Sequence, residues 1–224
     1  MLAYERMRLA FLGPADGDRD ALREVAQLVF ERLDPDRIMY IGVDDVFDTA
    51  IEQWASEIVM GDPSDSALWD RAVRACAVSD HPSIDSFLRR ERQRERLRRI
   101  TCLPNAHART VELLSGVVAL IIHDVAMLDD EDVVPAELVV FGKAVEPMIK
   151  KMGQRVFISP GPLGHLRGGV LLLEEEQGGE LVASVLDSNG GQVRREVVVV
   201  GSQQSLPQVL VRDASLDNVQ GTRR

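Results

Sequence analysis

The chain has 224 residues, of which 45% are hydrophobic and 28% charged, so it can bury a full core as one large domain or two small ones. Its net charge of −10 argues against general nucleic-acid binding, because an acidic surface repels the phosphate backbone. Its longest apolar runs are far shorter than the roughly 20 residues of a membrane helix, and its two cysteines indicate neither a disulfide framework nor a zinc site. We therefore expect a cytoplasmic protein without membrane or nucleic-acid partners.

The N-terminal elements predict a βαβ unit. Arg8–Leu12 is a short apolar run that predicts a strand. Ala21–Leu33 carries apolar residues at the spacing of an amphipathic helix, with Asp18 or Asp20 as its cap. Ile38–Gly42 is a second strand of buried type, so the first strands are expected to pair in parallel.

The middle of the chain predicts helices between two strands. Ile58–Met60 predicts a third, brief strand, and residues 65–100 predict two helical pieces broken near His81–Pro82. Residues 103–107 (LPNAH) are expected to form a loop, and Gly116–Ile122 predicts a further strand that ends at His123.

The last third predicts an antiparallel-rich region. Asn189-Gly190 is the turn signal of a β-hairpin between the last two strands. We expect one domain over residues 1–201, with a helical insertion at about 65–105, and a polar tail over residues 202–224. The strands predicted here are Leu138–Phe141, Arg155–Ile158, Gly169–Glu174, Leu181–Leu186 and Val193–Val200.

Strand ends repeatedly deliver loops, at Gly13, Gly42, Gly61, His123, Gly142 and Ser159. In open α/β sheets ligands bind outside the carboxyl ends of strands. In this order the loops resemble those of the calcineurin-like metallophosphoesterases, in particular their small bacterial phosphodiesterase branch. The family carries, in order, Asp-x-His, Gly-Asp, Gly-Asn-His/Cys-Asp, a lone His, Gly-His-x-His and an Asn-Pro-Gly-Ser turn. The resemblance implies an α/β (α+β) fold, a two-sheet β-sandwich flanked by helices.

The first three motifs are altered in this chain. Gly13-Pro14-Ala15-Asp16-Gly17 resembles the first motif, with proline at its metal-binding aspartate and Asp16 at its histidine. Ile41-Gly42-Val43 resembles the second, with valine replacing the metal-bridging aspartate. Gly61-Asp62-Pro63-Ser64 is taken as the third, with Asp62 in place of asparagine.

The later motifs keep the glycine and proline pattern and lose most ligands. His123 matches the lone histidine, and residues 142–147 resemble the Gly-His-Thr-His-x-Pro motif with Lys143 and Val145 at its histidines. Residues 159–164 match the Asn-Pro-Gly-Ser-x-Gly turn.

The losses argue against the family's reaction, which as the resemblance implies needs two metals that clamp phosphate and activate a water. Valine offers no lone pair and an ammonium repels a dication, so we expect no cofactor and no catalytic residue. One alternative is a phosphoesterase with a single divalent metal, such as manganese, on Asp16, Asp62 and His123. Another is a sensor in which Lys143 supplies the charge that holds a phosphate or nucleotide.

An arginine-rich segment runs against the overall charge. Residues 89–99 (RRERQRERLRR) hold seven arginines and two glutamates, a local charge of +5. Glutamate–arginine pairs at helical spacing are typical of a solvent-exposed helix, and the segment also fits a docking surface for an acidic protein through Arg92, Arg94 and Arg96. We therefore predict a catalytically degenerate, protein-binding chain, with homo-oligomerisation left open.

Overall fold

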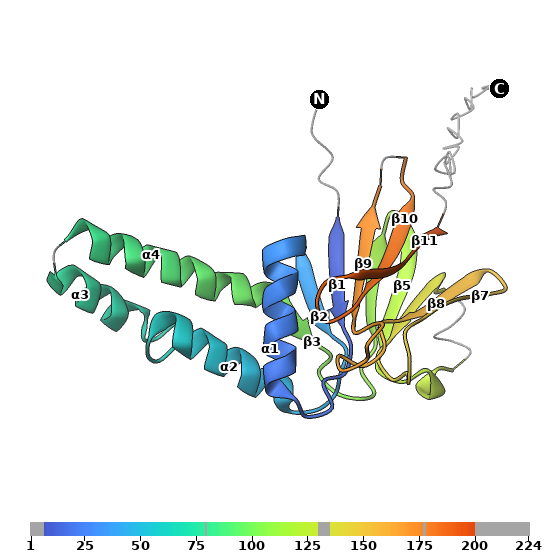
Figure 1. The fold of residues 1–224 in the computed structure, drawn as a ribbon, viewed down its shortest axis with the longest axis horizontal. Helices are drawn as coiled ribbons and strands as arrows, with labels where there is room; N and C mark the ends of the chain where they lie inside the picture. Colours follow the sequence, from blue (N-terminus) through green and yellow to red (C-terminus); the bar gives the residue numbers. More distant parts are fainter. Residues whose placement is uncertain (1–6, 79, 130–134, 177, 200–224) are drawn as a thin grey trace, which may run out of the picture.

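The computed structural model describes residues 7–78, 80–129, 135–176 and 178–199 (Figure 1). In this part of the chain the fold is α+β, with two mixed sheets flanked by four helices, which confirms the predicted fold class. The predicted tail over residues 202–224 lies outside the described residues. None of the described helices combines the length and hydropathy needed to span a bilayer.

The first sheet contains the N-terminal βαβ unit. Its six strands lie in the order β11-β10-β9-β1-β2-β3. The pairs β1–β2 and β2–β3 are parallel, whereas β9, β10 and β11 pair antiparallel. Its strands are β1 (Arg8–Leu12), β2 (Arg37–Tyr40), β3 (Ile100–Cys102), β9 (Val170–Glu175), β10 (Leu181–Leu186) and β11 (Gln192–Val199).

The second sheet has the order β4-β5-β6-β8-β7. The central strands β5, β6 and β8 are parallel, and the outer strands β4 and β7 pair antiparallel with their neighbours. Its strands are β4 (Thr110–Leu114), β5 (Val117–Ile122), β6 (Leu138–Phe141), β7 (Met148–Met152) and β8 (Arg155–Ser159).

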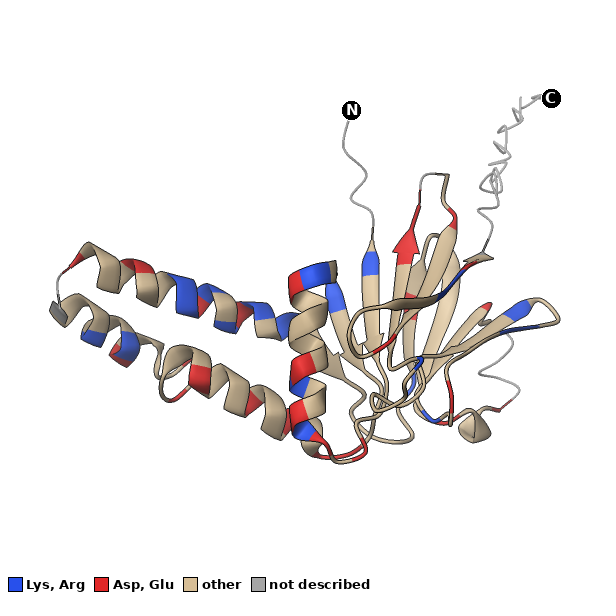
Figure 2. Ribbon diagram, viewed as in Figure 1, with Lys and Arg blue, Asp and Glu red and all other residues tan. Residues whose placement is uncertain are grey.

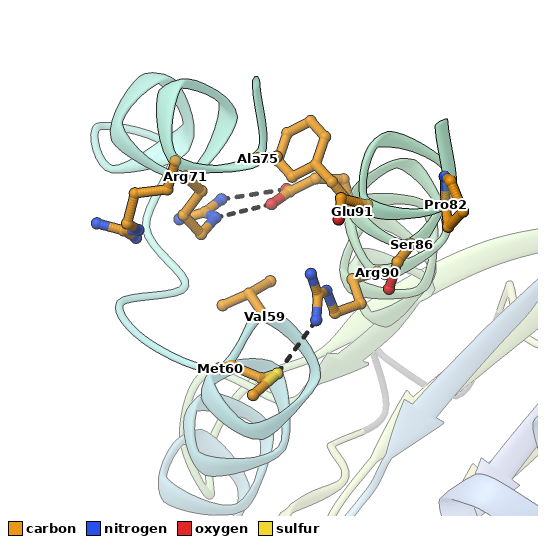
Figure 3. Close-up of a pocket in the computed structure, with 11 residues that line it drawn as sticks. Val59, Met60, Arg71, Ala75, Pro82, Ser86, Arg90 and Glu91 are labelled. Atoms are coloured by element: carbon orange, nitrogen blue, oxygen red, sulfur yellow. Dashed lines mark hydrogen bonds and ion pairs between the residues drawn. The ribbon is translucent and has the colours of Figure 1, made fainter. Parts of the chain in front are cut away.

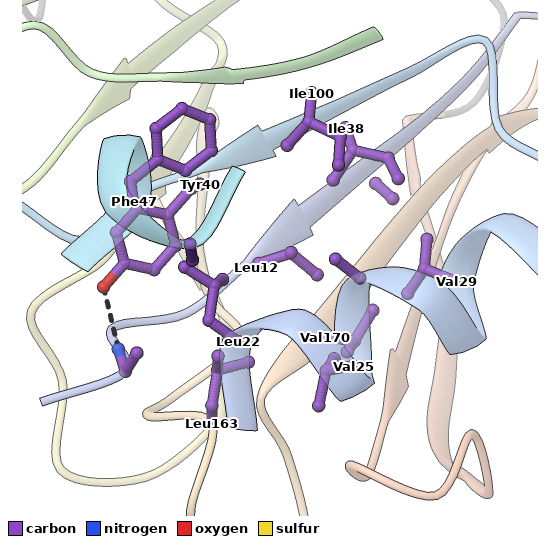
Figure 4. Packing of buried hydrophobic residues seen from close by; sticks show 14 of the residues in the cluster. Leu12, Leu22, Val25, Val29, Ile38, Tyr40, Phe47, Ile100, Leu163 and Val170 are labelled. Atoms are coloured by element: carbon purple, nitrogen blue, oxygen red, sulfur yellow. Dashed lines mark hydrogen bonds between the residues drawn. The ribbon is translucent and has the colours of Figure 1, made fainter. Parts of the chain in front are cut away.

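Apolar layers fill both faces of the first sheet. One cluster, which includes Phe11, Ile121 and Leu171, lies between the two sheets. The other packs the helices against the opposite face, where Leu12, Leu22 and further side chains interdigitate (Figure 4). Alternate residues of β1 therefore enter different clusters, as the two-residue period of a strand requires.

Helices connect the parallel strands of the first sheet. The N-cap of α1 (Arg19–Leu28) is Asp18, one of the two residues predicted for this role. The helix continues into a short π-helical turn, η1 (Val29–Leu33). A short 3-10 turn, η3 (Val125–Met127), follows β5.

The β2–β3 connection forms a helical arm, defined here as residues 46–96. It consists of α2 (Val46–Val59), α3 (Leu68–Val78) and α4 (His81–Arg96), and the turn η2 (Leu97–Arg99) joins it to β3. α3 and α4 form a hairpin that extends away from the sandwich (Figure 1). Basic residues gather along α4, and α2 carries acidic ones (Figure 2).

The structure corrects one predicted strand and adds three. Ile58–Met60 is the end of α2, where Met60 is a left-handed C-cap with φ of 58°. The apolar run before Gly-Asp-Pro is the last turn of a helix and not a strand, with Val59 buried and Met60 exposed. The strands β3, β4 and β7 were not predicted, whereas the helical break near His81–Pro82 and the Asn189-Gly190 hairpin are confirmed.

Candidate functional site

The carboxyl ends of the parallel strands of both sheets meet at one edge, called here the loop edge. It comprises the loops after β1, β2, β3, β5, β6 and β8. Two glycines allow the sheets to converge there: a Cβ on Gly142 would lie 2.1 Å from the carbonyl oxygen of Ile41, and one on Gly13 would lie 1.8 Å from that of Gly161. Because both obstacles are backbone atoms, these glycines are required by packing.

A buried tyrosine joins the first two loops. The Tyr40 side chain is fully buried, and its hydroxyl accepts a hydrogen bond from the Ala15 backbone N–H at 2.9 Å (Figure 4). The same hydroxyl donates to Asp44 Oδ1 at 2.6 Å. Asp44 Oδ2 accepts from the Gly17 backbone N–H at 3.1 Å. Burial, together with the hydrogen bond to Asp44, raises the pKa of Tyr40, so the hydroxyl stays protonated.

Asp16 lies in the same loop and is exposed, with φ of 52°. This left-handed conformation is one that aspartate tolerates better than most residues. The predicted candidate therefore belongs to the loop edge. The helix cap is Asp18, whose side chain accepts from the Ala21 N–H at 3.0 Å, so Asp16 is not the cap of α1.

His123 lies at the end of β5 and also belongs to the loop edge. Its Nδ1 lies 3.0 Å from the carbonyl oxygen of Ile41 at the end of β2. Because a carbonyl oxygen only accepts, Nδ1 donates the hydrogen bond in this contact, and Nε2 is the ring nitrogen left for another partner. This half-buried histidine thus bonds one sheet to the other.

Lys143 follows β6 and carries its own counter-ion. Its Nζ lies 2.5 Å from Asp124 Oδ2, and the lysine side chain is 65% exposed. The hydrogen bond from Lys143 holds the pKa of Asp124 below its ordinary value. The ammonium charge that the sequence predicts for anion binding is therefore compensated by the residue next to His123.

Asp62 lies elsewhere, which corrects the motif assignment. It follows α2, whose 14 residues span about 21 Å at 1.5 Å per residue, and so it lies in the helical arm. Its carboxylate accepts from the Ser64 N–H at 2.8 Å, and its carbonyl accepts from buried Arg71. Asp62 is consequently not a neighbour of Asp16 and His123.

The third loop at the edge is the one after β3, residues 103–107. Asn105 occupies this loop, and its Oδ1 accepts from the His107 N–H at 2.9 Å. Asn105, and not Asp62, therefore lies at the loop edge. The sequence signal for this loop is the short strand Ile-Thr-Cys before Leu-Pro-Asn, which directly follows the arginine-rich helix.

The three residues predicted to bind a single metal, Asp16, Asp62 and His123, do not lie together in the described structure. Among the described residues no group of three or more His, Cys, Asp or Glu side chains is placed to hold a metal ion. Asp16 and His123 lie at the loop edge, and Asp62 lies in the arm. At two positions where the resemblance predicts metal ligands the side chains cannot coordinate a metal: Val43 is 39% and Val145 90% exposed.

The arginine-rich segment is only partly free for docking. Arg94 is buried, with hydrogen bonds to Glu91 at 2.9 Å, Asp65 at 2.9 Å and Glu95. Although burial acts in the opposite sense, the hydrogen bonds that Arg94 donates to Glu91 and Asp65, together with the charge of Glu95, raise the pKa of Arg94. The predicted docking role at Arg94 is thus replaced by a structural one.

The other two predicted docking residues differ from each other. Arg96 pairs with Asp34 at 3.1 Å and lies over the Phe30 ring, 5.4 Å from its centroid, which holds α4 against η1. Arg92 is exposed and lines an open cleft beside Leu88. Of the three, Arg92 is the residue that suits contact with a partner.

Comparison with known proteins identifies similar folds only. No family model and no curated protein matches the sequence. Among solved structures, the fold is similar to Yfce, a phosphoesterase from E. coli (12% identity, 86% of this chain and 100% of that one, TM-score 0.47). It is also similar to a predicted phosphoesterase from Streptococcus pneumoniae (12%, 87% and 99%, 0.45) and to Vps29 from Entamoeba histolytica complexed with Zn²⁺ (14%, 85% and 97%, 0.42). Likeness at this level of identity concerns the fold and not the chemistry of the loop edge.

Proposed function

We propose that this chain is a catalytically degenerate metallophosphoesterase-like protein that acts by binding a protein partner. The observation that carries the proposal is that polar groups of the loop edge bond to one another. Asp44 is bound to Tyr40 and Gly17, His123 to Ile41, and Lys143 to Asp124. A hydrolytic metal centre needs lone pairs that converge on one point, whereas these side chains form hydrogen bonds and an ion pair that hold the loops together.

The helical arm supports a binding role. It extends from the sandwich (Figure 1) and exposes large apolar side chains, with Trp69 at 77% and Val73 at 65% exposure on one face of α3. Residues four apart lie on the same side of a helix, so the two side chains form a short stripe. Exposed aromatic residues beside arginines are typical of protein interfaces.

The experiment is metal analysis combined with an assay. Purified full-length protein is analysed for bound metals, and its Mn²⁺-dependent hydrolysis of bis(p-nitrophenyl) phosphate is measured beside His123→Ala. We expect no stoichiometric metal and the same background rate for both proteins. Stoichiometric metal with turnover that His123→Ala abolishes would overturn the proposal.

That outcome would instead favour a second candidate, a metal-dependent phosphoesterase with a reduced site. Its specific support is that Asp16 and His123 share the loop edge and that Nδ1 of His123, and not Nε2, makes the contact with Ile41. Such a site would bind one divalent ion, such as manganese, and water would fill the coordination positions that the protein leaves open.

A phosphate or nucleotide sensor around Lys143 is the weakest candidate, because Asp124 already compensates its charge. Calorimetric titration with phosphate and with AMP distinguishes a sensor around Lys143 from a lysine that only pairs with Asp124. We expect negligible heats for wild type and Lys143→Ala alike, and saturable binding lost in the variant would establish the sensor.

A further inference from the structure

A cavity of about 490 Å³ opens where the end of α2 meets the α3–α4 hairpin (Figure 3). Val59, Ala75 and Phe87 give it an apolar floor, and three arginines, Arg71, Arg74 and Arg90, also line it. It lies in the helical arm, away from the loop edge. Nothing in the loop-edge chemistry accounts for it.

The arginines of the arm and of the adjoining turn η2 differ in their partners. Five are satisfied by carboxylates: Arg71 by Glu91, Arg94 by Glu91, Asp65 and Glu95, Arg98 by Asp65 and Glu95, and Arg96 and Arg99 by Asp34. Within the described part of the chain, Arg74 and Arg90 make no ion pair. The contact of Arg90 is with the neutral Met60 Sδ, at 3.1 Å (Figure 3).

The charge inside the cavity is therefore unbalanced. Glu91 also lines it, but two nitrogens of Arg71, at 2.7 and 3.1 Å, and one of Arg94 use both of its oxygens. The two remaining guanidiniums are half-buried or exposed beside apolar side chains. Guanidinium groups in such a setting form strong, charge-assisted hydrogen bonds with carboxylates.

We propose that this cavity binds an acidic peptide segment of a partner protein. An apolar side chain of the segment enters between Val59 and Phe87, and its flanking carboxylates pair with Arg74 and Arg90. Groove binding between helices with charged flanks is a recurring mode of peptide recognition. The inference rests on the proposed binding function and names its partner class. Charge complementarity to Arg74 and Arg90 favours carboxylates, and the apolar floor of the cavity favours a peptide side chain over a nucleic acid.

The test is selection of peptides against the full-length protein. A random dodecapeptide library displayed on phage is panned, and enriched peptides are synthesised with a fluorescein label for anisotropy. We expect enrichment of Asp or Glu beside an apolar residue, and affinity that falls with added salt. The double variant Arg74→Glu/Arg90→Glu should weaken binding at least about tenfold, since two charge-assisted contacts are lost.

The matched control is Arg89→Glu/Lys150→Glu, which makes the same change of charge on two exposed residues, in α4 and β7, that do not line the cavity. It should change affinity by less than about threefold, as expected for screened charges. Circular dichroism checks that each variant is folded. The variant Arg74→Gln/Arg90→Gln removes both charges without reversing them.

Three results would overturn the proposal: no enrichment, peptides without acidic residues, or equal binding by both double variants. Enriched peptides that compete with single-stranded DNA but lack an apolar residue would also count against it. A failure here leaves the metal and hydrolysis assays unaffected, so the loss of this site and the loss of the non-catalytic function are distinguishable.

Discussion

The hairpin of the helical arm should depend on one carboxylate, Glu91. Among the described side chains of α3, Arg71 alone is buried, and its side chain is 3% exposed. It forms a two-point contact with Glu91, which is itself 13% exposed, and Glu91 also pairs with Arg94. Glu91→Gln leaves this buried guanidinium without its counter-charge while changing the side-chain volume little.

The magnitude follows from the contacts that remain. Loss of one partner of a buried ion pair costs about 3–5 kcal/mol. Arg71 keeps its hydrogen bonds to the carbonyls of Asp62 and Ser64, and Arg94 keeps Asp65. We therefore take the lower end, about 3 kcal/mol, which corresponds to about a hundredfold change in the opening equilibrium of the hairpin.

Hydrogen exchange followed by mass spectrometry measures this opening locally. Amides of α3 should lose about two decades of protection, while those of β1 and β5 change little, since the sandwich has its own core. The control is Glu95→Gln, whose side chain is 48% exposed and pairs with Arg94 and Arg98. An exposed pair contributes at most about 1 kcal/mol.

The double variant Arg71→Met/Glu91→Leu provides a second check. Replacing a whole buried pair with apolar side chains is often neutral or stabilising, so protection of α3 should recover. Equal protection in wild type and Glu91→Gln, or equal losses in Glu91→Gln and Glu95→Gln, would refute the reasoning.

Three further outcomes concern stability. Tyr40→Phe leaves the Ala15 N–H without its buried acceptor and should lower the unfolding free energy by about 1–3 kcal/mol in urea; an unchanged midpoint would contradict it. Gly142→Ala should be more damaging, because its Cβ would lie 2.1 Å from the Ile41 carbonyl oxygen, and a near-normal melting temperature would show that the sheets can separate cheaply. The Arg71 hydrogen bond lowers the pKa of Glu91 below its ordinary 4.5, so its stabilisation of the hairpin should be complete above that value and lost as the pH falls through the lowered pKa; constant α3 protection between pH 6 and pH 3 would exclude this.

The sequence predicts most of the sandwich because its strands are buried and bounded by turn residues. Arg8–Leu12 and Leu138–Phe141 are such runs, and both are strands. β7 was not predicted because Met148–Met152 contains two lysines, which an edge strand exposed on one side accommodates. β3 was not predicted because three residues that directly follow a helix carry little periodic signal.

The candidate site was predictable at the loops that directly follow strong strands. Asp16, His123 and Lys143 lie at the loop edge, as their positions after β1, β5 and β6 imply. Asp62 was misplaced because a helix end with Gly-Asp-Pro carries the same local signal as a strand end. Side-chain pairing was also beyond the sequence: the Lys143–Asp124 contact depends on the packing of β5 beside β6.

The helical arm begins and ends at neighbouring strands, and this has a consequence for how the protein folds. Ile38 of β2 pairs with Ile100 of β3, so the chain must close a loop that contains the whole arm before this pairing forms. Closure entropy grows only as the logarithm of loop length, by about 0.6 kcal/mol for each doubling. An arm several times longer than an ordinary crossover therefore slows the addition of β3 modestly, and turns of helix can be added to the α3–α4 hairpin or removed from it with little effect on sheet register.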